Sequence, residues 1–305
     1  MRVTVTGATG MIGRALVGEL LGRGDEVTAL GRDPARARAA LPAGVQAVAW
    51  PDPKGTPAPP EGLRGRDAVV HLAGERLDQR WSAPVKREVR DSRVLGTRNL
   101  VAALRALEDR PATLISQSAV GYYGPHGDER IDEKTPAGDD FLARVCREWE
   151  AEAERAEELG VRVVRTRTGV VLSASGGALR RMLPPFRLGV GGPVASGRQY
   201  VAWVHLDDVV GAILLCLDDP RVHGPVNVTA PDPATNRELA RALGRVLRRP
   251  AVVPVPAPAL RLLYGEMATT VTTGARVVPS GLRGLGYRFR RPELDDALRA
   301  AVGSR

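Results

Sequence analysis

The chain has 305 residues, of which 43% are hydrophobic and 26% charged, a size and composition typical of one large α/β domain or a domain with a smaller lobe. The formal net charge is +9, but the arginines are spread along the chain and aromatic residues make up 4%, so we expect no nucleic-acid partner. The longest apolar run is far too short to span a bilayer and Met1 leads directly into an apolar strand, so we expect no targeting segment, no membrane partner and a cytoplasmic location.

Short β-rich runs alternate with helix-period segments in the first half of the chain, which is the pattern of βαβ units and a parallel sheet. The predicted strands are Arg2–Thr6, Glu26–Leu30, Val45–Trp50, Asp67–Ala73, Thr113–Ser118 and Val161–Arg167. Apolar spacing over Ile12–Leu21 predicts a helix after the first strand, and a longer helix is expected at about Asp140–Leu159, closed by Gly160. The proline-rich stretch Pro51–Gly62 is expected to be a surface loop.

The pattern changes after the sixth strand. Ser173–Gly197 is rich in glycine and proline, and within it Leu183–Pro193 is a candidate lid with glycine hinges. The later elements expected from spacing are strands at Tyr200–His205 and Val226–Thr229, helices at Asp207–Leu217, Asn236–Leu247 and Pro292–Val302, and a proline-punctuated stretch at Pro250–Pro258. We therefore predict an α/β fold with a Rossmann doubly wound parallel sheet at residues 1–172 and 200–230, and a smaller α/β substrate lobe at 173–199 and 231–305.

The sharpest motif is the run GATGMIG between the first strand and the first helix. In a GxxGxxG at this place, the first glycine permits a tight turn, the second lets the backbone approach a pyrophosphate, and the third lets helix and strand pack closely. The free N–H groups and positive dipole end of the helix then face the phosphates. We predict that a dinucleotide binds at Gly7, Thr9, Gly10, Met11, Ile12 and Gly13.

The end of the second predicted strand decides between NAD and NADP. NAD-specific sites carry a carboxylate there that holds the ribose 2′-hydroxyl, whereas this chain reads Gly31-Arg32-Asp33. Arg32 can form a charge-assisted fork with a 2′-phosphate, and Arg36 and Arg38 add positive field. We predict NADP(H) in preference to NAD(H). The alternative is that Arg32 is a solvated loop residue and Asp33 holds the ribose of NAD.

Longer segments carry a family resemblance. The glycine loop and the run DAVVHLAG at 67–74 resemble the extended short-chain dehydrogenase/reductase superfamily. The segments HLAGE (71–75), SAVGYYG (118–124), LPPFRLGVGGP (183–193) and RPAVVPVPAPAL (249–260) are similar to one atypical branch of it, the NAD(P)-dependent epimerase-like family with a C-terminal domain of unknown function of the DUF1731 type. The resemblance covers essentially the whole chain.

The resemblance implies further cofactor contacts at the strand ends and on the helix after the fourth strand. Beside the glycine loop, the implied residues are Gly31, Arg32, Leu72, Ala73, Gly74, Glu88, Arg93 and Val170. For Leu72, Ala73 and Val170 the alternative is core packing. In this fold the two roles coincide, because the carboxyl ends of the strands form the wall of the crevice.

Ordinary members of the superfamily use a Tyr-x-x-x-Lys pair, whose spacing puts the general acid/base and its activator on one helix face. None of the three lysines has a tyrosine four residues before it, so the pair is absent. If Glu150 matches a glutamate of the superfamily, Leu142 and Cys146 stand where the pair would be. The candidates that remain for catalysis are Ser118, at the superfamily's Ser/Thr position, and the nearby Tyr122, Tyr123 and Glu75.

Three functions remain open from the sequence. The first is an NADP(H)-dependent oxidoreductase or epimerase with altered acid/base groups, which acts on a small substrate such as a nucleotide-linked sugar. The second is a redox-responsive regulator that binds NADP(H) without turnover. The third is the binding of an acidic ligand by Arg93 and His205. No motif specifies an oligomeric state.

Several of these residues also have structural interpretations. Tyr122 and Tyr123 follow a strand, where tyrosines often pack with a solvated hydroxyl. His205 lies between a strand and a helix, where Asp207 is a candidate N-cap. The acidic run Glu148–Glu158 is expected to be a solvated helix face.

The two cysteines, Cys146 and Cys216, are far apart and follow no CxxC spacing. We expect buried free thiols in a reducing compartment, with Cys146 in the core of its helix. No sequence pattern of metal ligands is present, so we expect no metal.

Overall fold

The computed structural model describes residues 1–303 and is built around a seven-stranded parallel sheet. The strands are β1 (Arg2–Thr6), β2 (Glu26–Gly31), β3 (Gln46–Ala49), β4 (Ala68–His71), β5 (Thr113–Ala119), β7 (Arg162–Thr168) and β11 (Gly224–Val228). Their order is β11-β7-β5-β4-β1-β2-β3, so the chain runs outward from β1 to β3 and then returns to β4. This reversal makes the topological switch point of a Rossmann fold, where ligands bind beyond the strand ends. The predicted fold class is confirmed.

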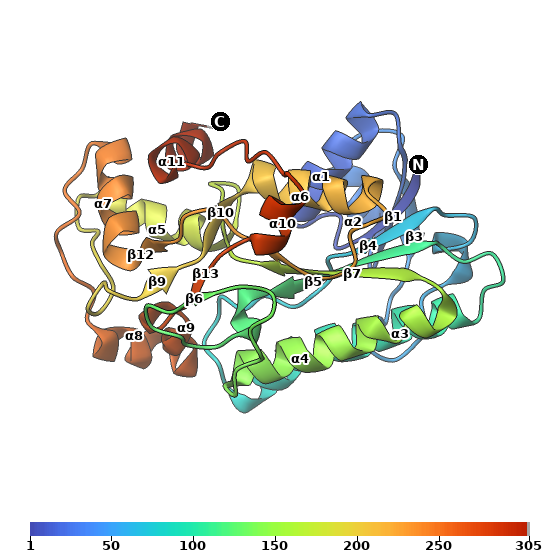
Figure 1. Cartoon of the computed structure of the whole chain (residues 1–305), viewed down its shortest axis with the longest axis horizontal. Coiled ribbons are helices and arrows are strands. Elements are labelled where there is room, and N and C mark those ends of the chain that lie inside the picture. The colour runs from blue at the N-terminus through green and yellow to red at the C-terminus, as the bar shows by residue number, and fades with distance from the viewer. Residues whose placement is uncertain (304–305) are drawn as a thin grey trace.

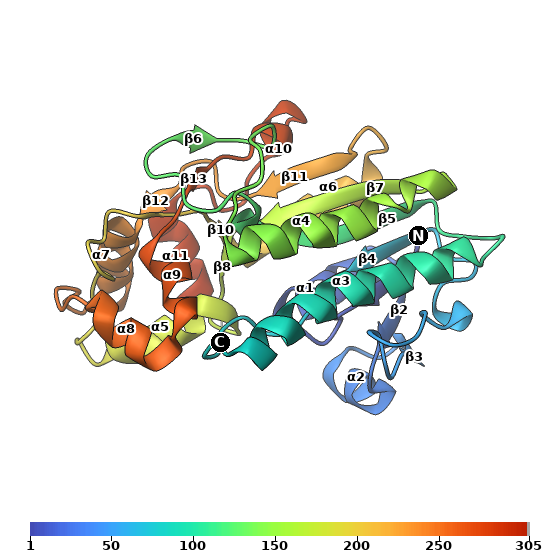
Figure 2. The same cartoon turned by 90° about the horizontal axis from the view of Figure 1, so that it is seen from below.

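Helices cover both faces of the sheet (Figures 1 and 2). On one face lie α3 (Ala83–Arg105) and α4 (Phe141–Glu154), and on the other α1 (Met11–Gly22) and α6 (Leu206–Asp218), while α2 (Pro34–Ala40) lies between β2 and β3 in the chain. Because successive strand side chains alternate between faces, Val69 packs toward α3 and its neighbour Val70 toward α1 and α6. Burial on both faces explains why the central strand β4 begins with the apolar run Ala68-Val69-Val70.

A smaller lobe lies at one end of the sheet (Figure 1). Its core joins α5 to α7 and α11 through Leu179, Phe186, Leu243 and Leu298. Its helices are α5 (Gly177–Arg187), α7 (Asn236–Leu247), α8 (Ala257–Tyr264), α9 (Thr269–Thr272) and α11 (Leu294–Gly303). The short helix α10 (Ser280–Gly284) packs instead against β11, with Leu282 in the core of the large sheet. The short strands are β6 (Arg130–Ile131), β8 (Val170–Leu172), β9 (Tyr200–Val201), β10 (Trp203–His205), β12 (Ala234–Thr235) and β13 (Arg276–Val277). Single 3₁₀ turns lie at Pro60–Gly62, Val120–Tyr122, Glu157–Leu159 and Glu266–Ala268. The exact division into core and lobe stays a prediction.

Two segments differ from their predicted structure. The expected strand at 200–205 is divided at Ala202 into β9, which pairs with β12, and β10, which pairs with β8. The stretch at 173–197 contains the helix α5 in spite of Pro184 and Pro185. The role of Leu183–Pro193 as a lid stays a prediction. Two of its glycines are closely packed, since a Cβ on Gly191 would lie 2.5 Å from the Phe186 ring and one on Gly192 would lie 2.1 Å from the Val253 oxygen. They hold this segment tightly against the lobe.

The C-terminal segment is tied to the core through the start of α6. His205, not Asp207, is the N-cap of α6, and its Nδ1 accepts the Asp207 N–H at 3.1 Å. The buried Asp208 carboxylate accepts the backbone N–H groups of Arg290 at 2.7 Å and Arg291 at 2.9 Å. Burial lowers the pKa of His205. His205 and Asp208 therefore have structural roles here, in capping α6 and in holding the C-terminal segment.

Candidate functional site

The glycine loop closes on itself and on the end of β4. Gly7 has a φ of +66°, and a Cβ there would lie 2.8 Å from the Leu72 carbonyl. A Cβ on Gly13 would lie 2.3 Å from the Gly7 oxygen, and one on Gly10 would lie 3.1 Å from the same atom. No side chain caps the N-terminus of α1, which begins after Gly10. The three glycines therefore let the loop fold tightly against itself and β4, and the uncapped start of α1 leaves N–H groups for a ligand. We call this loop and helix start the cradle; it fits a pyrophosphate.

A buried hydrogen-bond chain supports the wall of this cradle. The Thr6 hydroxyl oxygen accepts the N–H groups of Leu72 at 3.1 Å and Ala73 at 3.2 Å. Its own proton then goes to His71 Nδ1, 2.8 Å away, which assigns the Nε2–H tautomer, and that nitrogen lies 3.1 Å from Thr97 Oγ1. Thr6 and Thr97 thus position the strand end that faces the predicted cofactor site, a role that the sequence assigned to neither.

The buried His71 makes stability depend on pH. Burial lowers the pKa of His71 from 6.5 to about 4, so the unfolded chain binds a proton between these values that the folded chain excludes. The free energy of unfolding should therefore fall by about 3 kcal/mol as pH drops from about 6.5 to 4. Denaturant titrations of His71→Gln should show less of this loss. The exposed His223→Gln should retain all of it, and equal slopes for both variants would contradict the assignment.

The end of β2 presents arginine rather than a free carboxylate. Arg32 is exposed, and within residues 1–303 its side chain has no hydrogen bond or ion pair. Asp33 is the N-cap of α2, and its carboxylate accepts the Arg36 N–H at 3.1 Å. Arg36 and Arg38 are exposed on α2. Asp33 is thus engaged in capping, which disfavours the alternative in which it holds the ribose.

Arg93 fastens the loop after β4. Its guanidinium donates hydrogen bonds to the carbonyl oxygens of Glu75 at 2.9 Å and Val89 at 3.0 Å. Gly74 leaves room for the guanidinium, since a Cβ on Gly74 would lie 3.2 Å from Arg93 Cζ. Burial lowers the pKa of Arg93. Glu88, in contrast, is on the exposed side of α3 and pairs with Lys54 at 2.6 Å.

The proposed acidic-ligand site of Arg93 and His205 gains no support from this geometry. Arg93 already holds two backbone carbonyls, and the buried His205 caps α6. Val170 begins β8 beside Trp203 and is half-buried, as are Leu72 and Ala73. Their cofactor contacts stay predictions, in positions that also serve the core.

Two of the four catalytic candidates belong to a buried polar network. The Ser118 hydroxyl is 1% exposed and donates to Glu150 Oε1 at 2.6 Å. Glu150 in turn receives two bonds from Arg167, at 2.9 and 2.8 Å. Tyr123 is fully buried between Arg167 and Asn227, and burial raises its pKa to about 12. In this structure both hydroxyls are committed to the network, and their catalytic roles stay predictions.

The acidic run on α4 is not a uniformly solvated face, contrary to the sequence interpretation. Glu150 and Glu152 are each 4% exposed. Burial disfavours the charge of Arg167, but the hydrogen bonds and charge of Glu150 outweigh this and raise its pKa. A signal was present in the sequence, because an arginine in a central strand requires a buried carboxylate partner.

The other two candidates are less buried. Tyr122 is half-buried, the Arg167 guanidinium lies 3.5 Å from its ring, and its hydroxyl has no hydrogen bond within residues 1–303. Glu75 is half-buried next to the loop that Arg93 holds. On α4, Leu142 packs against Gly121, and the Cys146 thiol is buried beside Ser118 with its pKa raised to about 12. No side chain at these two helix positions can take the part of the missing Tyr-x-x-x-Lys pair.

The described part of the chain contains neither a membrane-spanning helix nor a cluster of metal ligands. No helix among residues 1–303 is long and apolar enough to cross a membrane. In the same residues, no group of three or more His, Cys, Asp or Glu side chains is placed to hold a metal ion.

Comparison with known proteins assigns the family. A model described as "NAD dependent epimerase/dehydratase family" matches residues 3–229, which is well over half of the chain. The chain belongs to the NAD-dependent epimerase/dehydratase family. A second model, "Domain of unknown function (DUF1731)", matches residues 255–301 of this epimerase-family chain. The resemblance inferred from the motifs is confirmed.

Relatives match over nearly the full length. The SDR39U1 homolog of Arabidopsis thaliana, described as chloroplastic, is 42% identical over 99% of this chain and 87% of its own. The epimerase family protein Mb2239 of Mycobacterium bovis is 41% identical over 97% of this chain and 96% of its own.

Solved structures agree with the fold. Human epimerase family protein SDR39U1, solved with NADPH, has 36% identity, a TM-score of 0.90 and complete coverage of both chains. A nucleoside-diphosphate sugar epimerase from Corynebacterium glutamicum has 32% identity and a TM-score of 0.78 over 99% of this chain and 58% of its own. UDP-glucuronic acid 4-epimerase from Bacillus cereus, at 17% identity and a TM-score of 0.80, shows the fold alone.

Proposed function

We propose that this epimerase-family protein binds NADP(H) in the crevice beyond β1, β2 and β4. The observation that carries the proposal is the cradle of Gly7, Gly10 and Gly13, where the absence of Cβ atoms lets the loop fold tightly beside the uncapped start of α1. The NADPH-bound human relative at 36% identity supports the same choice of cofactor. Calorimetric titration with NADP⁺, NADPH, NAD⁺ and NADH tests it, after a check for cofactor retained through purification. Binding of none of the four would refute it.

Arg32 is proposed to hold the 2′-phosphate. Arg32→Glu should weaken NADPH binding by on the order of 100-fold, because a charge-assisted pair is replaced by repulsion. NADH, which lacks the phosphate, should lose little. Arg38→Glu, an equal charge change on the exposed side of α2, is the control and should have a smaller effect. If Arg32→Glu weakens the binding of NADPH and NADH equally, Arg32 does not contact the 2′-phosphate.

We further propose oxidoreductase or epimerase chemistry on a small substrate. Bound nicotinamide supplies a hydride donor or acceptor, and the chain supplies the walls and the proton. Tyr122 is the best-supported candidate for the proton donor, because its hydroxyl has no hydrogen-bond partner in the described residues, whereas the hydroxyl of Tyr123 is buried. The nucleotide-sugar class is supported by the Corynebacterium relative. Turnover in an NADPH absorbance screen that falls strongly in Tyr122→Phe, with cofactor affinity retained, would support this assignment.

A redox-responsive regulator is the second candidate. The observation in its favour is that Leu142 and the buried Cys146 thiol stand on α4 where the superfamily carries its proton-transfer pair. In this case NADPH and NADP⁺ should bind with different affinities, while carbonyl and sugar-nucleotide substrates should leave NADPH unchanged. A substrate that is turned over would exclude the regulator-only function.

A further inference from the structure

Positive charge is concentrated in the lobe, although arginines occur throughout the sequence. Residues 173–199 and 231–305 hold 17 arginines and six acidic residues. The rest of the chain holds 27 basic and 29 acidic residues. The chain is therefore nearly neutral over residues 1–172 and 200–230 and strongly basic over 173–199 and 231–305, and the field of the basic part favours an anionic partner.

Exposed aliphatic side chains are concentrated in the same lobe. Among the large hydrophobic residues most exposed to solvent in residues 1–303, all but Met1 belong to it. They are Leu188, Val190, Val252, Val253, Leu262, Leu263 and Val271. Leu188 is 78% exposed and Val252 is 76% exposed, so neither contributes to the core. Exposed apolar side chains that gather on one surface usually mark a binding face.

Two loops bring these aliphatic residues beside unpaired arginines. The loop after α5 and the turn after α7 lie together, because the Val253 N–H donates to the Gly191 carbonyl at 3.3 Å. Gly244 allows the second turn to fold back, since a Cβ there would lie 2.7 Å from Ala251 Cβ. Arg248 at this turn has a φ of +53°, a conformation that glycine usually takes at a helix end. A charged residue is thus kept where the backbone prefers glycine.

Most of the arginines here form no ion pair. The side chains of Arg187, Arg241, Arg248 and Arg249 make no hydrogen bond or ion pair within residues 1–303, and all four are exposed. Arg241, Arg248 and Arg249 line a hollow of about 430 Å³ together with Arg245, Ala251 and Val252. Of its four arginines, only Arg245 is paired, with Asp295 at 2.8 Å. The mutual repulsion of these guanidinium groups is relieved by an external anion.

We infer that this end of the lobe docks on an anionic phospholipid surface. The distal patch, defined as Arg187, Leu188, Val190, Arg248, Arg249 and Val252, presents aliphatic side chains for the acyl boundary and guanidinium groups for the headgroup phosphates. Two copies of the chain packed through this patch would bring like charges together. An acidic peptide would neutralise the arginines but leave the aliphatic side chains of both loops in water.

This inference revises the expectation of no membrane partner. That expectation rested on the lack of an apolar run long enough to span a bilayer, and a protein that binds the membrane surface needs no such run. It does not depend on the proposed NADP(H) site, which lies at the sheet end beyond β1 and β4, whereas α7 and α8 lie at the far end of the lobe (Figure 1). Loss of vesicle binding with cofactor affinity retained therefore separates the two proposals.

The test is co-sedimentation of the full chain with vesicles of phosphatidylcholine alone and of phosphatidylcholine mixed with phosphatidylglycerol. The wild type should pellet only with the mixed vesicles, and less so as salt is raised. Arg248→Glu/Arg249→Glu should weaken this binding by on the order of 100-fold or more, since each basic residue contributes about fivefold and each substitution also adds a repelled negative charge. Leu188→Asp/Val252→Asp should also release the protein, because insertion of aliphatic side chains is lost.

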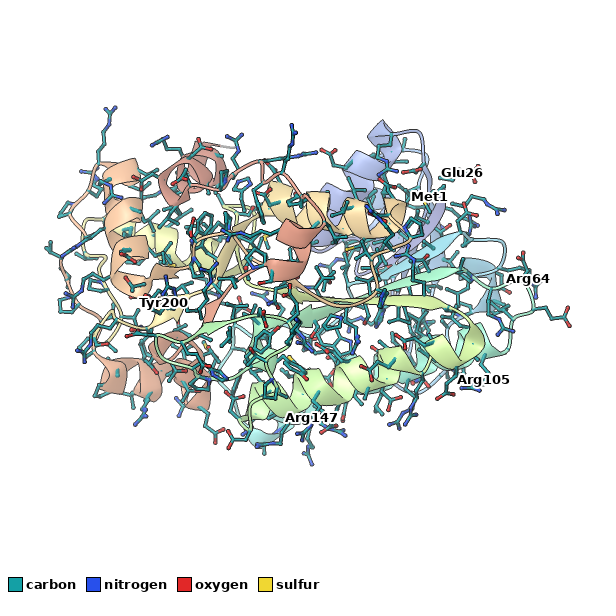
Figure 3. The ribbon with its side chains drawn as sticks, viewed as in Figure 1. Met1, Glu26, Arg64, Arg105, Arg147 and Tyr200 are labelled. Atoms are coloured by element: carbon teal, nitrogen blue, oxygen red, sulfur yellow. The ribbon has the colours of Figure 1, made fainter. Side chains whose placement is uncertain are left out.

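Arg64→Glu/Arg288→Glu is the matched control, with the same change of net charge at exposed arginines outside the patch. Arg64 lies at the end of the molecule opposite the lobe (Figure 3). Retained pelleting of this variant supports the inference, as does unchanged NADPH affinity in all three variants. Equal loss in control and patch variants would show non-specific adsorption by net charge and overturn it. Wild-type protein that binds polyglutamate but no vesicle would overturn it in favour of an acidic protein partner.

Discussion

Replacement of Gly13 by alanine is expected to abolish NADP(H) binding and to destabilise the Rossmann core. The added Cβ would lie 2.3 Å from the Gly7 oxygen and 2.7 Å from Ala8 Cα, and both contacts are with backbone that has no room to move without opening the loop. Overpacking of this kind costs about 1–3 kcal/mol or more. A displaced loop no longer presents its N–H groups to the pyrophosphate, so calorimetry should detect no NADPH binding in the variant.

Gly18→Ala provides the control within the same helix. Gly18 lies on the exposed side of α1, and a Cβ there would meet no heavy atom within 4 Å. Since alanine is favoured over glycine in a helix by about 1 kcal/mol, this variant should be slightly more stable than the wild type and bind NADPH normally. Normal binding by Gly13→Ala would show that the cradle is not the phosphate site.

Glu150→Gln should cause the largest loss of stability among the acidic residues of α4. The change keeps the shape of the side chain but removes the charge that faces the buried Arg167, whose Nη2 lies 2.8 Å from Glu150 Oε2. Removal of one partner from a buried ion pair costs about 3–5 kcal/mol, because the remaining charge is left uncompensated. Arg165, which lies 3.6 Å from the same carboxylate oxygen, adds to this cost. Denaturant unfolding measures the loss directly.

Glu148→Gln is the control one half-turn earlier on the helix. The Glu148 side chain is 40% exposed and pairs with the partly exposed Arg90. Exposed ion pairs of this kind contribute about 0–1 kcal/mol, so this variant should unfold at nearly the wild-type denaturant concentration. If Glu150→Gln and Glu148→Gln lower the free energy of unfolding equally, the buried Glu150–Arg167 pair does not stabilise the fold more than an exposed pair does.

The strands and the first glycine loop followed from local pattern. The order of βαβ units, the GATGMIG run and the helix Asn236–Leu247 all depend on spacing along a short stretch of chain, and each lies where the sequence predicted it. The residues at the end of β2 could also be identified from a short stretch of sequence, because Arg32 and Asp33 are adjacent. Parallel topology then brings these strand ends to one edge of the sheet without further information.

Side-chain contacts between residues far apart in the sequence could not be predicted. Whether Ser118 faces a substrate or Glu150, and whether Asp208 serves α6 or the segment at 290–291, depends on which elements pack together. The close packing of Gly191 and Gly192 against Phe186 and Val253 was likewise not predictable, because these contacts form only in the folded lobe.

The sequence by itself determined the fold class, the family and the place of the phosphate cradle, since these rest on contacts between residues close in the chain. The tertiary structure decided which hydroxyls are buried, which acids are paired and which end of the lobe carries unpaired arginines beside exposed aliphatic side chains. The physical reason is that burial and charge pairing depend on neighbours from other elements, and a linear pattern does not specify those neighbours.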